Sequence, residues 1–194
     1  MAATANTATS LSESYYLRSF YKFNRDAATT SKRGELSKAN LSQADAQALR
    51  AAVRALRNFD LEDDTDDGSD IYASVSAFLK TYNNALDSSN NSGNYSLQRY
   101  AKQLKNLAKE HADELKDIGI TVKSDGTLEK NENLLKAADV SDIRDLFGED
   151  AEFATRSSNY AKRMNTKAAD LIYTELTQKG KNINLTLLPN PLYA

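Results

Sequence analysis

Cysteine and tryptophan are absent from this chain of 194 residues, histidine occurs once, proline twice and glycine seven times. Without cysteine there is no disulfide, no thiol nucleophile and no thiolate metal ligand. A single histidine without cysteine cannot supply the usual ligand set of zinc. The glycines stand singly, so neither the Walker pattern nor the dinucleotide-binding fingerprint occurs.

Long apolar runs and a strong excess of one charge are absent as well. No run approaches 20 apolar residues, the length that crosses a bilayer, and we expect no membrane span. The formal net charge is -2, which gives no electrostatic case for binding nucleic acid. The first residues, MAATANTATSLSES, contain neither a basic segment nor an apolar core, and we expect no conventional secretory signal.

Apolar residues at helical spacing recur through most of the chain. They predict helices over residues 11–28, 42–59, 71–86, 95–117, 131–138, 141–147 and 150–179. The predicted fold class is mainly α, an antiparallel helical bundle with coiled-coil-like packing and one small β-hairpin. We expect residues 1–10 to be disordered, residues 11–180 to form a single helical domain and residues 181–194 to form an extended apolar C-terminal tail.

Two local patterns refine this expectation. Ser42, with Asp45 three residues later, has the spacing of a capping box and predicts the start of the second helix. A seam repeats every seven residues in the predicted helix 95–117, at Leu97, Leu104, His111 and Ile118. We interpret His111 as a polar interruption of this seam rather than as a general base or metal ligand.

The β-hairpin is predicted over about Ile120–Leu128. The β-branched residues of Ile120-Thr121-Val122 suit a pleated strand. Gly126, in the dipeptide Asp125-Gly126, supplies the positive φ that a tight turn requires.

The ordered pieces DIGITVKSDGTLEKNENLLKAA and IRDLF resemble the C-terminal helical region of the flagellar filament-cap family (hook-associated protein 2). Upstream, AFLKTYNN at residues 77–84 resembles the F-x-x-x-YN helix that precedes this region in the family. The resemblance covers roughly Asp70–Leu176 and implies a helix, a small hairpin and a returning helix. The family's outer β-rich domains have no room in 194 residues, so the resemblance concerns the helical region alone.

The acidic segment EDDTDDGSD, residues 62–70, is the one candidate for a cation site. With Gly68 at the sixth position of an EF-hand loop, Asp63 and Asp67 fit the first and fifth positions, but Ser74 stands where a bidentate glutamate is needed. We interpret the segment as a solvated loop before a helix, with a weak cation site as the alternative. We predict no catalytic, cofactor-binding or metal-binding residue, no cofactor and no enzymatic activity.

Aromatic residues gather near the N-terminus and apolar residues near the C-terminus. Tyr15, Tyr16 and Phe20 are predicted to bind a protein partner, because aromatic residues on several faces exceed what one core stripe needs; the alternative is a central helix packed on all sides. One buried face of this helix is predicted from the spacing of Tyr16, Phe20, Phe23 and Ala27. The partner-binding residues predicted in the tail are Leu185, Leu187, Leu188, Leu192 and Tyr193. The alternative for the tail is that it folds back over its own bundle.

The sequence and its resemblance together predict a non-enzymatic structural or assembly protein. It is similar to a minimal flagellar cap or flagellin, and we expect it to act by helix–helix association with itself or with flagellar proteins. The alternative is a soluble helical adaptor or chaperone-like module that binds a flagellar or surface protein. The resemblance implies a bacterial protein that is extracellular and flagellum-associated if it is exported without a cleaved signal, and cytoplasmic otherwise.

Overall fold

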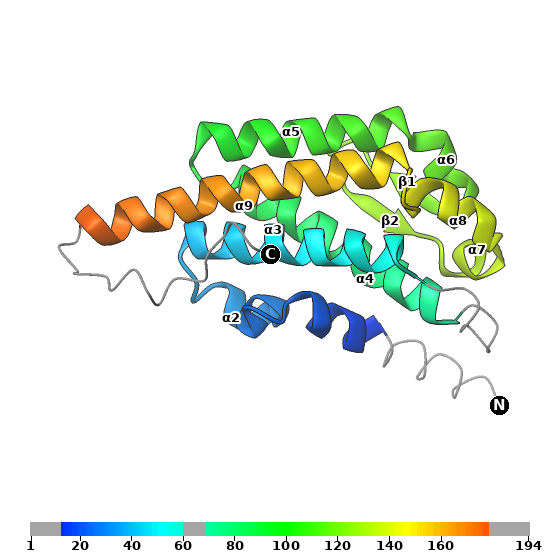
Figure 1. The fold of residues 1–194 in the computed structure, drawn as a ribbon, viewed down its shortest axis with the longest axis horizontal. Coiled ribbons are helices and arrows are strands. Elements are labelled where there is room, and N and C mark those ends of the chain that lie inside the picture. Colours follow the sequence, from blue (N-terminus) through cyan, green and yellow to red (C-terminus); the bar gives the residue numbers. More distant parts are fainter. Residues whose placement is uncertain (1–12, 60–68, 179–194) are drawn as a thin grey trace.

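Four long helices form a bundle in the computed structural model, which describes residues 13–59 and 69–178 (Figure 1). They are α3 (Lys38–Arg57), α4 (Ser69–Asn90), α5 (Tyr95–Glu110) and α9 (Glu152–Gln178). Helix α3 packs against α4 and α9, and α5 packs against the same two helices, so the four close a ring around the core. Contacts such as Ser42 with Ser88 and Glu110 with Arg156 join opposite ends of neighbouring helices, which makes those neighbours antiparallel. The predicted antiparallel bundle is confirmed.

Helix α3 begins four residues before the predicted cap. Ser37 is the N-cap: its backbone is extended, and its side chain accepts a hydrogen bond from the backbone N–H of Asn40 at 3.2 Å. The capping box at Ser42 and Asp45 was wrong, because both residues lie inside the helix and are fully buried. Their polar side chains bond to other parts of the chain rather than to the start of α3.

The predicted helix 11–28 is broken in the structure. Residues 13–20 are helical, a turn follows, and then come a 3-10 helix η1 (Arg25–Ala28) and a short helix α2 (Thr30–Arg33). Residues 13–36, which we call the N-terminal arm, lie along the lower side of the bundle in Figure 1. Because the helix ends before Phe23, that side chain leaves the predicted buried face and is 62% exposed.

The predicted helix 95–117 is interrupted at its histidine. Helix α5 ends at Glu110, His111 has a non-helical backbone (φ -106°, ψ 27°), and α6 (Ala112–Asp117) follows. The seam itself is buried as predicted at Leu97, Leu104 and Ile118. After the break, α6 packs against β1 of the hairpin and against α8.

The hairpin is confirmed. Strands β1 (Ile120–Val122) and β2 (Leu128–Lys130) pair antiparallel, with Ile120 opposite Lys130 and Val122 opposite Leu128. Gly126 in the turn has φ +87°. The Asp125 carboxylate accepts hydrogen bonds from the backbone N–H and the hydroxyl of Thr127, and these bonds lower the pKa of Asp125.

Two short helices return the chain to the bundle. Helix α7 (Glu132–Ala137) is capped by Asn131 and α8 (Val140–Phe147) by Asp139. Phe147 then packs edge-to-face against Phe78 of α4 and Phe153 of α9, with ring centroids 4.9 and 5.7 Å apart. The predicted apolar stripe of α4 is buried throughout, at Ile71, Val75, Phe78, Leu79, Tyr82 and Leu86. Across the described ranges, no helix combines the length and apolar character that crossing a membrane requires.

Candidate interaction surfaces

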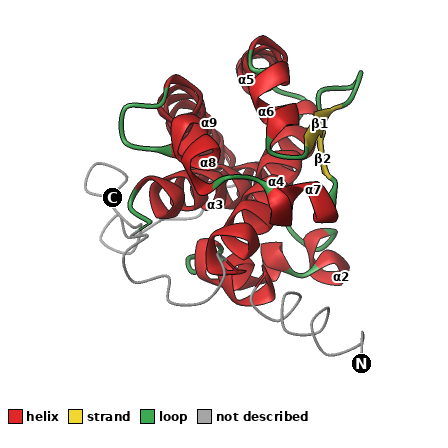
Figure 2. Ribbon diagram, turned by 90° about the vertical axis from the view of Figure 1, so that its right-hand side faces the viewer, coloured by secondary structure: helices red, strands yellow, loops and turns green. Residues whose placement is uncertain are grey.

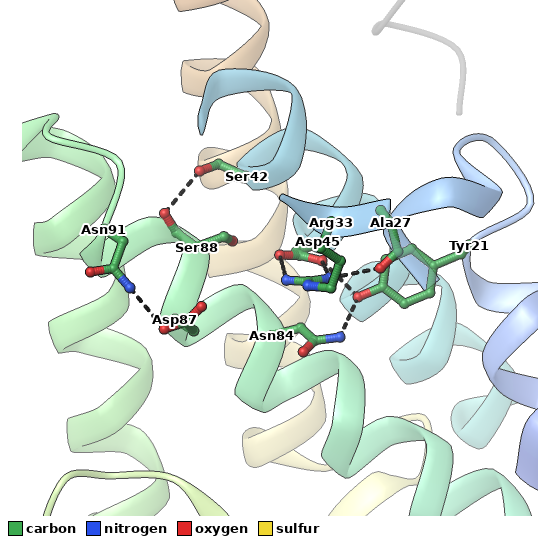
Figure 3. A network of polar contacts seen from close by, with 9 residues as sticks. All are labelled: Tyr21, Ala27, Arg33, Ser42, Asp45, Asn84, Asp87, Ser88 and Asn91. Carbon is green, nitrogen blue, oxygen red and sulfur yellow. Dashed lines mark hydrogen bonds and ion pairs between the residues drawn. The ribbon is translucent and has the colours of Figure 1, made fainter. Parts of the chain in front are cut away.

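A buried polar network holds the N-terminal arm to the bundle (Figure 3). Asp45 on α3 is 0% exposed, and its two carboxylate oxygens accept hydrogen bonds from Nη1 and Nη2 of Arg33, each at 2.8 Å. The hydroxyl of Tyr21 donates to Asp45 at 2.7 Å and accepts from the amide of Asn84 on α4 at 2.8 Å. Arg33 also donates to the carbonyl of Ala27 at 2.7 Å. The network therefore joins the arm, α3 and α4.

The charges in this network are structural rather than reactive. Burial raises the pKa of the Tyr21 phenol, and the negative charge of Asp45 raises it further. Burial alone lowers the pKa of Arg33, but its hydrogen bonds and ion pair with Asp45 outweigh this effect and raise it. Tyr21 thus stays protonated and Arg33 stays charged around neutral pH.

A second anchor holds the beginning of the arm. Oε1 of the Glu13 carboxylate lies 3.0 Å from Nζ of Lys80 on α4, and Oε2 lies 2.8 Å from Nζ of Lys130 on β2. Lys130 also donates to the hydroxyl of Ser76 at 3.0 Å. Burial on its own raises the pKa of Glu13, but the hydrogen bonds and charges of the two lysines outweigh it and lower the pKa.

The arm contains the three aromatic residues predicted to bind a partner. Tyr15 is 65% exposed and keeps its ring at the surface. Tyr16 is half-buried and packs against the core, with its ring centroid 6.2 Å from that of Phe20. Phe20 is only 3% exposed because its ring fills the core beneath the arm, which agrees with the alternative of a packed helix; its partner contact stays a prediction. The five residues predicted in the tail lie outside the described residues, as does most of the acidic segment.

Tyr82 and Asn83 of the F-x-x-x-YN motif in α4 form hydrogen bonds with the hairpin. The hydroxyl of Tyr82 lies 3.2 Å from the carbonyl oxygens of both Leu104 and Gly126, and it is buried. The Asn83 amide donates to the carbonyl of Leu128 at 2.8 Å and accepts from the N–H of Leu128 at 2.9 Å. Asn83 thus acts as a short additional strand edge beside β2. The motif is visible in the sequence, but the sequence analysis did not predict that it bonds to the hairpin.

Helix α9 extends beyond the bundle. Figure 1 shows its C-terminal turns, in orange, passing the ends of α3 and α5. Its apolar stripe continues into these turns, where Ile172 and Leu176 are half-buried and Tyr173 is 47% exposed. We call residues 171–178 the α9 overhang.

An open groove of about 480 Å³ lies between α5 and α9. Helix α5 contributes Tyr100, and α9 contributes Asn159, Lys162, Arg163, Thr166, Lys167 and Asp170. We call these seven residues the basic groove. The sequence analysis did not predict this groove. The signal that could have indicated a basic surface is the segment 156–167, which contains four basic residues and no acidic residue.

The described residues bring together no metal-ligand cluster of three or more histidine, cysteine or acidic side chains. His111 lies at the junction of α5 and α6, where Nδ1 is 3.1 Å from Oε2 of Glu114 and the ring packs edge-to-face on Phe153. These contacts position the helix break. Comparisons with protein-family models, curated proteins and solved structures each find no match to this chain.

Proposed function

We propose that this chain is a non-enzymatic assembly protein that acts by helix–helix association between copies. The α9 overhang is the observation that carries the proposal. Inside the bundle the α9 stripe is buried, as at Met164 and Ala168. The same stripe continues into the overhang at Ile172 and Leu176, which are half-buried, and the C-terminal turns of α9 pass the ends of α3 and α5 (Figure 1).

The occupant we assign to this face is the overhang of a second copy. Two identical apolar faces form an isologous contact, the commonest kind in homo-oligomers. In this contact Ile172 and Leu176 of each copy become buried against each other, with Tyr173 at the edge, and the burial of their apolar surface stabilises the dimer. The contact lies at the tip of α9, away from the core, so it forms without any change in the bundle.

The flagellar part of the proposal rests on the resemblance in residues 70–176. Its pieces are far apart in sequence, yet Tyr82 and Asn83 of the YN motif bond directly to Gly126 and Leu128 of the hairpin. This supports reading the pieces as one inherited unit rather than as separate short matches. On this proposal the protein is a bacterial, minimal relative of flagellar cap or flagellin proteins.

A second candidate is an adaptor that binds another protein without polymerising. The closed ring of α3, α4, α5 and α9 favours it, because the core is complete within one copy. The adaptor uses the same exposed face of α9 for a different protein.

Sedimentation velocity over a wide concentration range tests the proposal. We expect the full chain to form larger species as concentration rises, and the double variant Ile172→Asp, Leu176→Asp to stay monomeric. The matched control is Thr174→Asp, Gln178→Asp, which places the same charges on exposed positions of the same turns. Circular dichroism checks that each variant is folded. A wild-type chain that is monomeric at every concentration contradicts self-assembly and favours the adaptor.

A further inference from the structure

The outer side of α5 and α9 is rich in positive charge that the described residues leave unpaired. The basic groove contains three cations, Lys162, Arg163 and Lys167, and one carboxylate, Asp170. None of the three cations forms an ion pair with any described residue. This contrasts with Arg156 one turn earlier, which lies 2.8 Å from both Glu110 and Glu152.

The groove is open to a partner. Figure 2 shows α5 and α9 next to each other on the upper side of the bundle, above α3 and α4. The half-buried ring of Tyr100 forms one wall and the α9 side chains form the other. A segment rich in carboxylates matches this charge.

The same chain contains such a segment. Residues 60–68 read DLEDDTDDG, which places six carboxylates in nine residues with no basic residue among them. We propose that the basic groove of one copy binds residues 60–68 of a second copy. This inference rests on the proposed assembly function and adds a second, electrostatic contact to the apolar one on α9.

Chain length favours a second copy over the same molecule. Phe59, the last described residue before the acidic run, lines the same small cavity as Glu149, which is just before α9. Lys167 lies about 22 Å along the axis from the start of α9, at 1.5 Å per residue. Asp64, in the middle of the run, extends at most about 17 Å from Phe59. Within one molecule this reach covers the axial distance to Lys162, about 15 Å from the start of α9, but falls short of Lys167. No residue of α3, the helix that ends beside Phe59, lines the groove.

A contact of this kind has a direction. The groove and the run are different surfaces, and the contact is heterologous when the groove of each copy takes the run of the next copy rather than the two copies exchanging runs. Such a contact repeats from copy to copy, whereas the isologous contact of the overhang joins only two. Together they give the two kinds of contact from which an extended assembly is built. The electrostatic contact is weakened by salt, because screening shortens the range of exposed charges.

Charge reversal and mixing of full-length chains test the inference. The groove variant is Lys162→Glu, Arg163→Glu, Lys167→Glu. The run variant is Glu62→Lys, Asp63→Lys, Asp64→Lys, Asp66→Lys, Asp67→Lys, which leaves one carboxylate and five lysines in the run. We expect each alone to associate at least about tenfold more weakly than wild type at low salt. An equimolar mixture regains association, because each variant then meets a partner of opposite charge. The matched control, Arg25→Glu, Lys38→Glu, Lys116→Glu, reverses three exposed cations elsewhere and associates as wild type does.

A zero-length carbodiimide cross-linker reports the contact directly. In a mixture of ¹⁴N- and ¹⁵N-labelled chains, we expect mixed-isotope links between the amine of Lys162 or Lys167 and carboxylates of residues 60–67. The Ile172→Asp, Leu176→Asp chain serves as a second background. Links that persist there show that the groove contact stands even if assembly through the overhang fails.

Four results overturn the inference. The first is that groove and run variants associate as tightly as wild type. The second is that only same-isotope links form, which assigns the contact to one molecule. The third is that the groove variant loses association while the run variant keeps it. The fourth is that wild type binds a DNA oligonucleotide through the groove at physiological salt. Either of these last two results assigns the groove to another polyanion.

Discussion

Arg33 and Asp45 form a two-bonded ion pair in which each guanidinium nitrogen lies 2.8 Å from one carboxylate oxygen. The carboxylate is fully buried in α3, and the arginine comes from α2 in the N-terminal arm. Tyr21 and Ala27 of the same arm complete its hydrogen bonding, so every group that is buried here has a partner. A satisfied network of this kind fixes where the arm packs, whereas a half-satisfied one is costly.

We therefore predict that Asp45→Ala strongly destabilises the fold. The substitution leaves the Arg33 charge half-buried without its counter-ion and removes the acceptor of the Tyr21 hydroxyl, and we expect a loss of about 3–5 kcal/mol in the free energy of unfolding. Urea denaturation measures it. The control is Asp26→Ala, which removes the exposed ion pair with Lys32 in the same arm and changes stability by less than about 1 kcal/mol. Equal effects of the two substitutions contradict the assigned role.

The misassigned capping box shows what local sequence cannot resolve. Ser42 and Asp45 have the residue types and spacing of a cap, and the pattern contains no sign of their partners. Those partners are Ser88 for Ser42, and Arg33 and Tyr21 for Asp45, at separations of 12 to 46 residues. Periodic apolar stripes were more reliable, because one face of a helix is buried whatever helix covers it.

The interaction surfaces were harder to predict for the same reason. Phe20 is buried and Tyr15 is exposed. This difference depends on where the first helix of the arm ends and how the arm packs on the bundle, which are properties of the tertiary structure. The basic groove combines Tyr100 of α5 with α9 residues about 60 positions later in the chain, and the overhang exists only relative to the lengths of α3 and α5. Neither surface has a local motif.

The ion pairs of Glu13 are expected to make the stability of the arm fall at acid pH. Its pKa is lowered in the folded chain by Lys130 and Lys80, against the opposing effect of burial. A lowered folded pKa means that the stabilisation is present above the ordinary pKa of about 4.5 and is lost as pH falls through the lower, folded value. We expect wild type to be more stable than Glu13→Gln near neutral pH and the difference to shrink as pH falls below the ordinary pKa of about 4.5.

Urea denaturation across this pH range checks the expectation. The difference between wild type and variant isolates Glu13 from Asp125 and Asp139, whose pKa values are also lowered. Glu35→Gln is the control, since Glu35 is an exposed carboxylate of the arm that forms no ion pair with a described residue. A difference that stays constant with pH contradicts the ion-pair assignment.

The YN motif predicts a third outcome. Asn83→Ala leaves both the N–H and the carbonyl of Leu128 without their partner, and we expect a loss of about 2–4 kcal/mol. Tyr82→Phe removes one buried hydroxyl and costs about 1–3 kcal/mol. Hydrogen exchange at the Leu128 amide measures the local effect, and it should quicken in Asn83→Ala. The exposed Asn133→Ala in α7 is the control, with a change within about 0.5 kcal/mol.

Gly119 and Gly34 give opposite expectations for the same substitution. Gly119 has φ +77°, and a Cβ built there lies 2.7 Å from both the Cβ of Leu134 and the backbone nitrogen of Leu135. Gly119→Ala therefore combines an unfavourable backbone with a collision against the start of α7, and we expect it to destabilise by about 3 kcal/mol. Gly34 has an ordinary helical backbone and open space around it, so Gly34→Ala stabilises by about 0.4–1 kcal/mol through the unfolded chain. Urea denaturation of both variants decides the matter: a Gly119→Ala chain as stable as wild type means that the link between α6 and the hairpin is not held in this conformation.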